Sequence, residues 1–285
     1  MNPDERATLT GHDGVVAFFD ILGYQNIILN NNIEDAATLV TDVVIGIPGT
    51  ITDELQGFVW ENRKPSRLSS TVLAEIQWYM FSDTIFAFLA AGDQTTKSAQ
   101  FRWMLFLGWC TLLQRRLFDA GLPVRGAIDS GRFFVRGNCF VGHPIVRAYR
   151  LSEKQDWSGC TLTDAARDQY QRLFKDGRSS PVAQHTRYLV CEYMAPLRDT
   201  VSKRVMCLRW GAAGKLTSPP KGSLREYVLG AFLKHNKDIP PEVHPKLHNT
   251  EVFLQYLVNT HAVPGRSSAE QRDEPTCSQW GITTQ

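Results

Sequence analysis

The sequence has almost no net charge. Its 285 residues include 31 Lys and Arg against 29 Asp and Glu, which gives a formal net charge of +2. A protein that wraps nucleic acid usually has a strongly basic face, so this balance argues against nucleic acid as a partner. A small anionic ligand is still compatible with it, because a local cluster of cations can bind phosphates while the whole chain stays neutral.

Long apolar runs are also missing. The longest charge-free stretch in the middle of the chain is 103–114, and its twelve residues would span about 18 Å as a helix, well short of the roughly 30 Å core of a membrane. We therefore expect a buried helix here and no stable membrane insertion. Residues 1–14 contain Asp4, Glu5 and Asp13 but no apolar core, so we expect no signal peptide and a cytoplasmic protein.

Several motifs of known chemistry do not occur. The six cysteines form no C-x-x-C pair, so in such a chain they are most simply reduced thiols. Neither G-x-x-x-x-G-K-[ST] nor G-x-G-x-x-G is present, which excludes the P-loop and the dinucleotide fingerprint, and G-x-S-x-G is absent too. His244 and His248 have the spacing of zinc ligands on a helix, but Pro245 lies between them and the glutamate of such sites is missing.

What the sequence does have is an alternation of strand and helix patterns. The predicted elements are, in chain order, strand 15–19, a helix capped by Asn32, strands 73–80 and 84–89, helix 96–120, strands 123–129 and 132–136, helix 144–154, strand 160–163, helix 165–174, strands 187–193 and 204–210, and helices 224–235 and 251–261. The turns at Ser82–Asp83 and Ser130–Gly131 predict two hairpins. The order predicts an α/β fold, an α+β sandwich with its helices on one face of the sheet.

Two aspartates stand where metal chemistry would need them. Asp20 closes an apolar strand, and Asp83 lies at the tip of the first hairpin. If the two strands are neighbours, both carboxylates project at one edge, where they can hold Mg²⁺ or Mn²⁺ for phosphoryl transfer. Each aspartate alone is equally consistent with a turn residue that bonds its own backbone. The segment 21–24 after Asp20 is a strand–turn–helix junction whose backbone N–H groups suit phosphate oxygens.

Four segments in one order resemble the class III nucleotide cyclases. They are 18–24 (FFDILGY), 81–84 (FSDT), 124–131 (VRGAIDSG) and 142–151 (GHPIVRAYRL), against the family patterns F-x-D-I-x-G-F, G-D, R-x-G-[IV]-x-x-G and G-x-x-V-N-x-A-x-R. The I-L-G variant after Asp20 resembles the pyrimidine cyclases of bacterial anti-phage (Pycsar) systems in particular. The resemblance covers about residues 14–165. It implies a ferredoxin-like or palm-like βαββαβ core with an extended sheet, within a catalytic domain that we expect to span residues 1–210. The resemblance does not explain the C-terminal part of the chain, where composition predicts a helical region 211–285 with a loose, polar tail from residue 264.

The resemblance also implies roles for individual residues. Asp20 and Asp83 match the carboxylates that hold two Mn²⁺ or Mg²⁺ ions per site, with the backbone carbonyl of Ile21 as a further ligand. Arg150 matches the arginine that stabilises charge on the α-phosphate, a role that suits a group that cannot lose its proton and can bond two oxygens. The nucleotide-binding residues implied by the first motif are Phe18, Ile21, Leu22, Gly23 and Tyr24.

The departures from the family pattern concern the base. Adenylate cyclases have lysine and aspartate, and guanylate cyclases glutamate and cysteine, where this chain has Tyr79 and Cys139. Neither purine pair is present, and Tyr79 either stacks on a smaller base or is simply a favourable strand residue. Val146 replaces the asparagine that precedes the arginine in the family pattern.

The implied activity is therefore that of a pyrimidine nucleotide cyclase. We expect it to convert UTP to 3′,5′-cyclic UMP and pyrophosphate as a second messenger in anti-phage defence. Alternatives are a cytidylate cyclase acting on CTP, a non-catalytic nucleotide sensor on the same fold, and a palm-type enzyme that makes another linkage such as a dinucleotide. The family also implies a head-to-tail homodimer with shared sites, for which we expect the apolar helix 103–113 to offer surface. Arg63, Lys64 and Arg67 either reach the outer phosphates or form a solvated loop.

Overall fold

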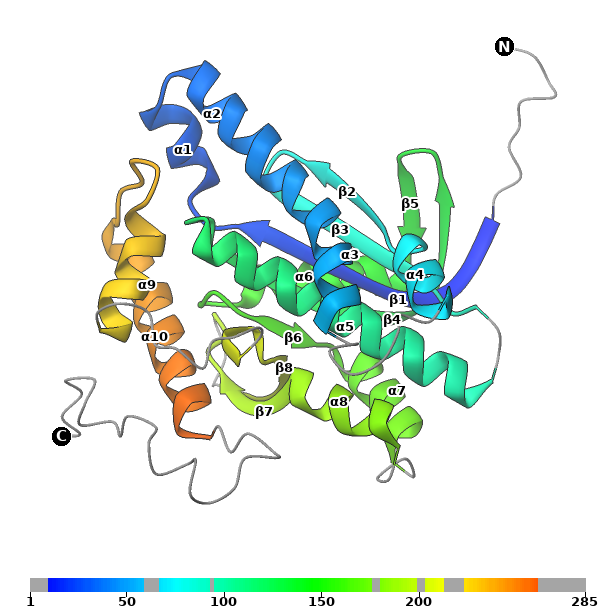
Figure 1. Cartoon of the computed structure of the whole chain (residues 1–285). Coiled ribbons are helices and arrows are strands. Elements are labelled where there is room, and N and C mark those ends of the chain that lie inside the picture. The colour runs from blue at the N-terminus through cyan, green and yellow to red at the C-terminus, as the bar shows by residue number, and fades with distance from the viewer. Residues whose placement is uncertain are drawn as a thin grey trace, which may run out of the picture.

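The computed structural model (Figure 1) describes residues 10–58, 67–92, 95–175, 180–198, 203–212 and 223–260. Arg63, Lys64 and the expected tail from residue 264 lie outside these ranges. The strands are β1 (Thr10–Ile21), β2 (Gln77–Phe81), β3 (Thr84–Ala90), β4 (Val124–Arg136), β5 (Cys139–Gly142), β6 (Cys160–Leu162), β7 (Val190–Ala195) and β8 (Lys203–Leu208). The helices are α1 (Tyr24–Asn30), α2 (Ile33–Leu39), the π-helix η2 (Val40–Ile45), α3 (Gly46–Phe58), α4 (Arg67–Ala74), α5 (Thr96–Asp119), α6 (His143–Lys154), α7 (Asp164–Phe174), α8 (Pro181–Leu189), the 3₁₀ turns η3 (Trp210–Ala212) and η4 (Pro241–Val243), α9 (Leu224–Leu233) and α10 (His244–Asn259).

All eight strands belong to one sheet. β1 to β4 and their connecting helices follow the order β-α-β-β-α-β, and these strands lie side by side as β2-β3-β1-β4 with antiparallel pairing throughout. This is the ferredoxin-like arrangement. Beyond β4 the sheet continues with β6, β8 and β7, while β5 pairs back onto the far end of β4. The predicted α/β class and the palm-like core with an extended sheet are therefore confirmed.

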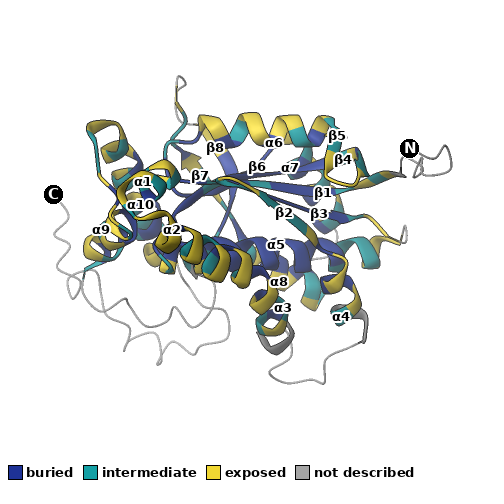
Figure 2. Ribbon diagram, turned by 90° about the horizontal axis from the view of Figure 1, so that it is seen from above, coloured by how far each residue is buried: buried dark blue, intermediate teal, exposed yellow. Residues whose placement is uncertain are grey.

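Helices cover both faces of the sheet (Figure 2). α3, α4, α5 and α8 lie on one side and α6 lies on the other. The strands of the core are apolar on both sides: in β4, Ile128 packs with the α5 layer, whereas Ala127 and Phe133 pack with Ala148 of α6. The prediction of helices on one face is therefore wrong, because the second face also presents an apolar surface that needs a helix to cover it.

α5 is the most deeply buried helix. Of its 24 residues, every one from 102 to 114 is buried inside the chain's own core. The expectation that helix 103–113 has surface to spare for a dimer is therefore wrong. In the part of the chain that the structure describes, neither α5 nor any other helix is long and apolar enough to cross a membrane.

In four places the boundaries of the elements differ from those predicted. β4 runs without a break through Ser130 and Gly131, which pair with Val15 and Gly14 of β1, and the hairpin turn comes later at Gly137. Residues 73–74 end helix α4 instead of opening a strand. Residues 187–189 end helix α8, which begins after the capping residue Ser180. The last helix begins at residue 244 instead of 251.

The C-terminal helices pack against the far end of the sheet. α9 and α10 contribute Val228, Phe232 and Phe253 to a second apolar cluster, which also contains Trp157 and Trp210. The Leu22 side chain from the end of β1 belongs to the same cluster. These helices are therefore in contact with the segment that follows Asp20.

A buried ion pair fixes α6 to the sheet. The Asp129 carboxylate in β4 is fully buried and accepts hydrogen bonds from Arg147 Nε (2.6 Å) and Nη2 (3.2 Å) in α6. The Ser130 N–H (2.6 Å) and the Thr163 hydroxyl (2.7 Å) also donate to it. Arg147 supplies the only positive charge among these donors.

We expect Arg147→Met to lower the free energy of unfolding by about 3 kcal/mol, because it leaves the buried Asp129 carboxylate without a cation. The Arg147 side chain is 46% exposed, which places the effect at the low end for such pairs. Arg150→Met is the matched control, since Arg150 is exposed and has no ion pair within the described residues, and we expect it to change stability by less than about 0.5 kcal/mol. Urea unfolding compares the two variants, and equal stabilities would contradict the role of the pair.

Candidate active site

Asp20 and Asp83 lie together at one end of the sheet. β1 and β3 are adjacent, with Asp20 opposite Thr84, the residue after Asp83. The Ile21 N–H donates to the Asp83 carbonyl at 2.9 Å, which closes the hairpin tip against the end of β1. Ser82 reaches this tip with a left-handed backbone (φ 54°). The strand adjacency that the acid pair requires is therefore present.

The Asp20 side chain is on the face of the sheet covered by α6. Alternate residues of a strand share a face, and Val16 and Phe18 of β1 belong to the cluster beneath α6. Phe18 lies edge-on to the ring of Tyr149 in α6, with 5.2 Å between the ring centroids. The acid pair is thus at the rim of an aromatic surface.

Arg125 is the principal partner of Asp20, a role that the sequence alone did not indicate. It lies directly opposite Asp20 in the β1–β4 ladder, and its Nε donates to Asp20 Oδ2 at 2.6 Å. The Arg125 and Asp20 side chains are 14% and 18% exposed. Arg125 Nη1 also donates to the Glu153 carbonyl in the last turn of α6, at 3.1 Å. The R-x-G motif contained this residue, but its contact depends on the strand register.

The pKa of Asp20 reflects its burial and the charges of Arg125 and Asp83 next to it. Burial raises the pKa of Asp20, the Arg125 guanidinium opposes that shift, and the nearby Asp83 carboxylate raises the pKa again through its charge and a hydrogen bond. Burial and the charge of Asp83 also raise the pKa of the Tyr24 phenol, which therefore lies near the same carboxylate. Two close carboxylates in a partly buried site are stabilised by a cation between them.

The donor set fits a hard divalent cation. Two carboxylates, followed by the backbone carbonyl of Ile21 at the strand end, supply the oxygen ligands that Mg²⁺ and Mn²⁺ prefer. No cluster of three His, Cys, Asp or Glu side chains occurs in the described ranges, so the acid pair would need substrate phosphates or water to complete the coordination.

Arg150 is on α6 and takes no part in the ion pair of Asp20 with Arg125. It is exposed on α6, one turn after Arg147, and no hydrogen bond or ion pair joins it to another residue in the described part of the chain. A hydrogen bond to Glu153 raises the pKa of the neighbouring Tyr149 phenol, and the charge of Asp20 adds to this shift. Tyr149 therefore lies near the acid pair. Arg150 is therefore free to contact another molecule.

Tyr79 and Cys139, the residues expected to contact the base, lie in and beside a cluster of aromatic rings. The Tyr79 ring stacks on Phe88 (centroids 6.3 Å apart, planes at 8°) and meets Phe140 edge-on at 4.7 Å. Cys139, next to Phe140 on β5, is exposed. Val146 is exposed on α6, and the Arg67 side chain lies outside the described residues.

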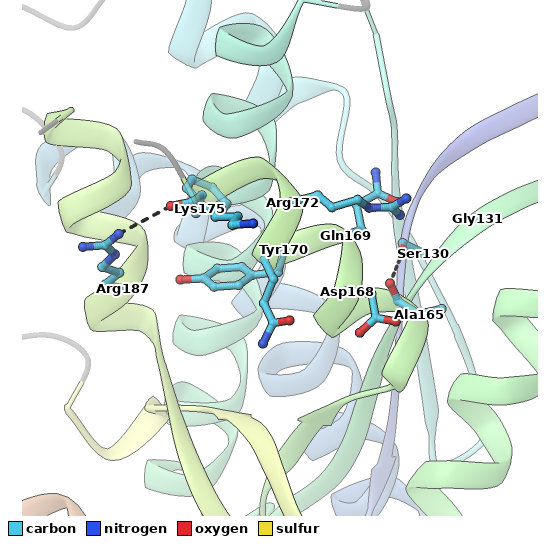
Figure 3. Close-up of a pocket in the computed structure, with 11 residues that line it drawn as sticks. Ser130, Gly131, Ala165, Asp168, Gln169, Tyr170, Arg172, Lys175 and Arg187 are labelled. Carbon is cyan, nitrogen blue, oxygen red and sulfur yellow. Dashed lines mark hydrogen bonds between the residues drawn. The ribbon is translucent and has the colours of Figure 1, made fainter. Parts of the chain in front are cut away.

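A separate hollow lies between β4, α7 and α8 (Figure 3). Its volume is about 980 Å³, and Tyr170, Arg172, Lys175 and Arg187 line it together with Ser130. Ser130 is five residues along β4 from Arg125, or about 17 Å. Burial raises the pKa of Tyr170 to about 12. None of the predicted site residues lines this hollow.

The chain is similar to several solved structures of known proteins. No protein-family model and no curated protein matches the chain. The catalytic core of a rhodopsin-guanylyl cyclase with converted specificity, in complex with ATPαS, has a TM-score of 0.45 and 9% identity over 71% of this chain and 98% of its own. The guanylyl cyclase Cya2 has a TM-score of 0.41 and 11% identity over 70% and 92%. A class III adenylyl cyclase-like ATP-binding protein from Pseudomonas aeruginosa has a TM-score of 0.33 and 14% identity over 64% and 42%.

These structural neighbours are two guanylyl cyclases and an adenylyl cyclase-like ATP-binding protein. With TM-scores of 0.45 or less and identities of 9% to 14%, these similarities assign neither a family nor a residue role to this chain.

Proposed function

We propose that the protein is a nucleotide cyclase that converts UTP to 3′,5′-cyclic UMP and pyrophosphate. The observation that supports this most is the pair Asp20 and Asp83, which the β1–β3 register brings to one edge of a palm-like sheet with Arg125 beside them. Two carboxylates and a guanidinium at one partly buried site suit a triphosphate and its metal ions.

Asp20, Asp83 and the Ile21 carbonyl would hold Mg²⁺ or Mn²⁺, two ions per site. When bound, these ions would lower the pKa of the ribose 3′-hydroxyl and screen the triphosphate charge. A cation on Asp20 competes with Arg125 for the same carboxylate, which leaves the guanidinium close to the phosphates. In the reaction a bond forms between O3′ and the α-phosphorus, the bond to the bridging oxygen of pyrophosphate breaks, and the hydroxyl proton passes to solvent.

Arg150 would act on a second copy of the chain. Because it is exposed and makes no hydrogen bond or ion pair with another described residue, it is available to the α-phosphate held by a partner. A head-to-tail homodimer would place two such shared sites between the copies. Two exposed apolar side chains are suited to burial in that interface: Phe81 (84%), which precedes the hairpin tip with Asp83, and Val146 (49%), which is on α6 with Arg150.

The preference for a pyrimidine rests on Tyr79 and Cys139, which reproduce neither purine pair. Tyr79 is already packed between aromatic rings, so it offers a rigid face for a base. The choice of UTP over CTP and the defence role of the product follow from the resemblance to the Pycsar cyclases. The alternative of a nucleotide sensor has one feature in its favour, the replacement of the family asparagine by Val146.

The test is incubation of the purified protein with Mn²⁺ and each of the four NTPs, with pyrophosphate measured and products identified by mass spectrometry. We expect cyclic UMP from UTP, or cyclic CMP from CTP, and none from an Asp20→Asn variant. Product from ATP or GTP alone would overturn the base assignment. Tight UTP binding without turnover would establish a sensor instead, and a dinucleotide product would overturn the cyclase reaction.

A further inference from the structure

The turn that follows Asp20 is supported by the C-terminal region of the chain. The Leu22 side chain packs in the cluster of α9 and α10, and its N–H donates to the Pro123 carbonyl at 2.8 Å. Gly23 comes next, with a left-handed φ of 77°, before α1 begins. The geometry of the residues beside the acid pair therefore depends on contacts with helices at the other end of the sequence.

Lys237 lies directly against Gly23. It is 4% exposed, in the loop between α9 and η4, and a Cβ added to Gly23 would be 3.0 Å from Lys237 Cδ. The aliphatic part of the lysine thus occupies the space beside the glycine backbone. A shift of the turn toward α9 would have to displace this side chain.

The Lys237 ammonium joins the ends of two helices. Its Nζ donates to the Gly121 carbonyl at 2.6 Å and to the Ala231 carbonyl at 3.0 Å. Gly121 follows the end of α5, and Ala231 is in the last turn of α9. Carbonyls at these positions lack helical partners and bear partial negative charge, so they suit a cation. Burial lowers the pKa of Lys237 to about 7, and Lys234 adds to this shift.

The same loop is bonded to α1 and to α5. Asn30 Nδ2 donates to the Asn236 carbonyl at 2.7 Å, and Asn31 Nδ2 to the His235 carbonyl at 3.0 Å. His235 Nε2 lies 2.7 Å from the Ala120 carbonyl. His235 and Asn236 both have left-handed backbones (φ 65° and 55°), a conformation that costs energy in residues with side chains. These bonds hold the loop in that shape.

We propose that Lys237 is a positioning residue of the proposed site: through Gly23 it holds the turn 21–24 in the conformation in which Asp20 and Asp83 bind divalent cations. This inference rests on the proposed function, since it assumes that the acid pair binds metal. It gives residues 223–260 a role as a structural support of the metal site. An apolar side chain at 237 would fill the space but leave the two helix-end carbonyls without their donor.

The test compares Lys237→Met with Lys246→Met. Lys246 is also buried in the C-terminal region, where its Nζ donates to the Glu242 carbonyl at 2.8 Å and pairs with Asp156 at 3.6 Å, so the control removes a second buried lysine that is not bonded to the turn. In metal-free protein we expect the amides of 21–27 to exchange hydrogen about tenfold faster in Lys237→Met, and within about twofold of wild type in Lys246→Met. In a Mn²⁺ titration followed by electron paramagnetic resonance, without nucleotide, we expect Lys237→Met to raise the Kd about tenfold and Lys246→Met to leave it unchanged.

A milder variant keeps the test decisive if Lys237→Met fails to fold. Asn30→Ala removes two bonds to the loop, those to the Asn236 carbonyl and to Asp238, and we expect it to raise the Mn²⁺ Kd about threefold. If the variants at 237 and 30 bind Mn²⁺ as tightly as wild type, the positioning role is overturned while cyclase activity stands. If wild type neither binds Mn²⁺ nor makes a cyclic nucleotide, both this inference and the proposed function are overturned.

Discussion

Asp83→Asn is expected to reduce turnover about 10³-fold while the protein remains folded. The amide keeps the size of the side chain but removes one of the two charges that would hold the metal ions. Losing about 4 kcal/mol of transition-state stabilisation, a fair magnitude for a metal-dependent step, corresponds to a factor of this size. The fold should tolerate the change, because Asp83 lies at a hairpin tip and its charge disfavours ionised Asp20.

A second measurement on the same variant does not depend on activity. Because the charge of Asp83 raises the pKa of Asp20, Asp83→Asn should lower the pKa of Asp20 when the carboxylate is titrated by NMR. Asp168→Asn is the matched control, since Asp168 is an exposed carboxylate of α7 that pairs with Arg167. Full activity in Asp83→Asn, or equal losses in both variants, would contradict the proposed metal site.

Much of the fold could be predicted from the sequence because its signals are local or belong to motifs. The charge-free apolar run 103–114 located α5, and Gly121, with φ 84°, follows its end as a C-terminal glycine should. β4 was misjudged because Ser130–Gly131 has the composition of a turn, whereas pairing with β1 holds both residues in the strand. In this case a tertiary contact overrides a local preference.

The candidate site was only partly predictable. Asp20 and Asp83 were identified from their positions next to turns and from the family resemblance, but the ion pair of Asp20 with Arg125 follows from a register that one sequence does not specify. The contact between Gly23 and Lys237 joins segments at opposite ends of the chain, and no local pattern indicates it. Such contacts arise only when the helices pack.

Arg150→Ala is expected to lower turnover between about 10²- and 10³-fold, the usual loss when a donor to developing charge is removed. The free energy of unfolding should hardly change, because the side chain is exposed and has no partner within the described residues. Arg147 differs from Arg150 in this respect, because its loss leaves the buried Asp129 without a cation and is expected to lower the free energy of unfolding. Turnover with saturating UTP and Mn²⁺, alongside urea unfolding, checks both statements. A large loss of stability with Arg150→Ala would contradict the assignment.

Mixing the two inactive variants tests whether this chain is a cyclase whose sites are shared between two copies. In a heterodimer of Asp83→Asn and Arg150→Ala chains, one site has lost both groups and the other keeps an intact acid pair and an intact arginine. We expect an equal mixture, allowed to exchange subunits, to form cyclic UMP at about a quarter of the wild-type rate, because about half of the dimers are mixed and each has one working site. A mixture as inactive as either variant alone, under conditions where subunit exchange is demonstrated, would contradict the shared site.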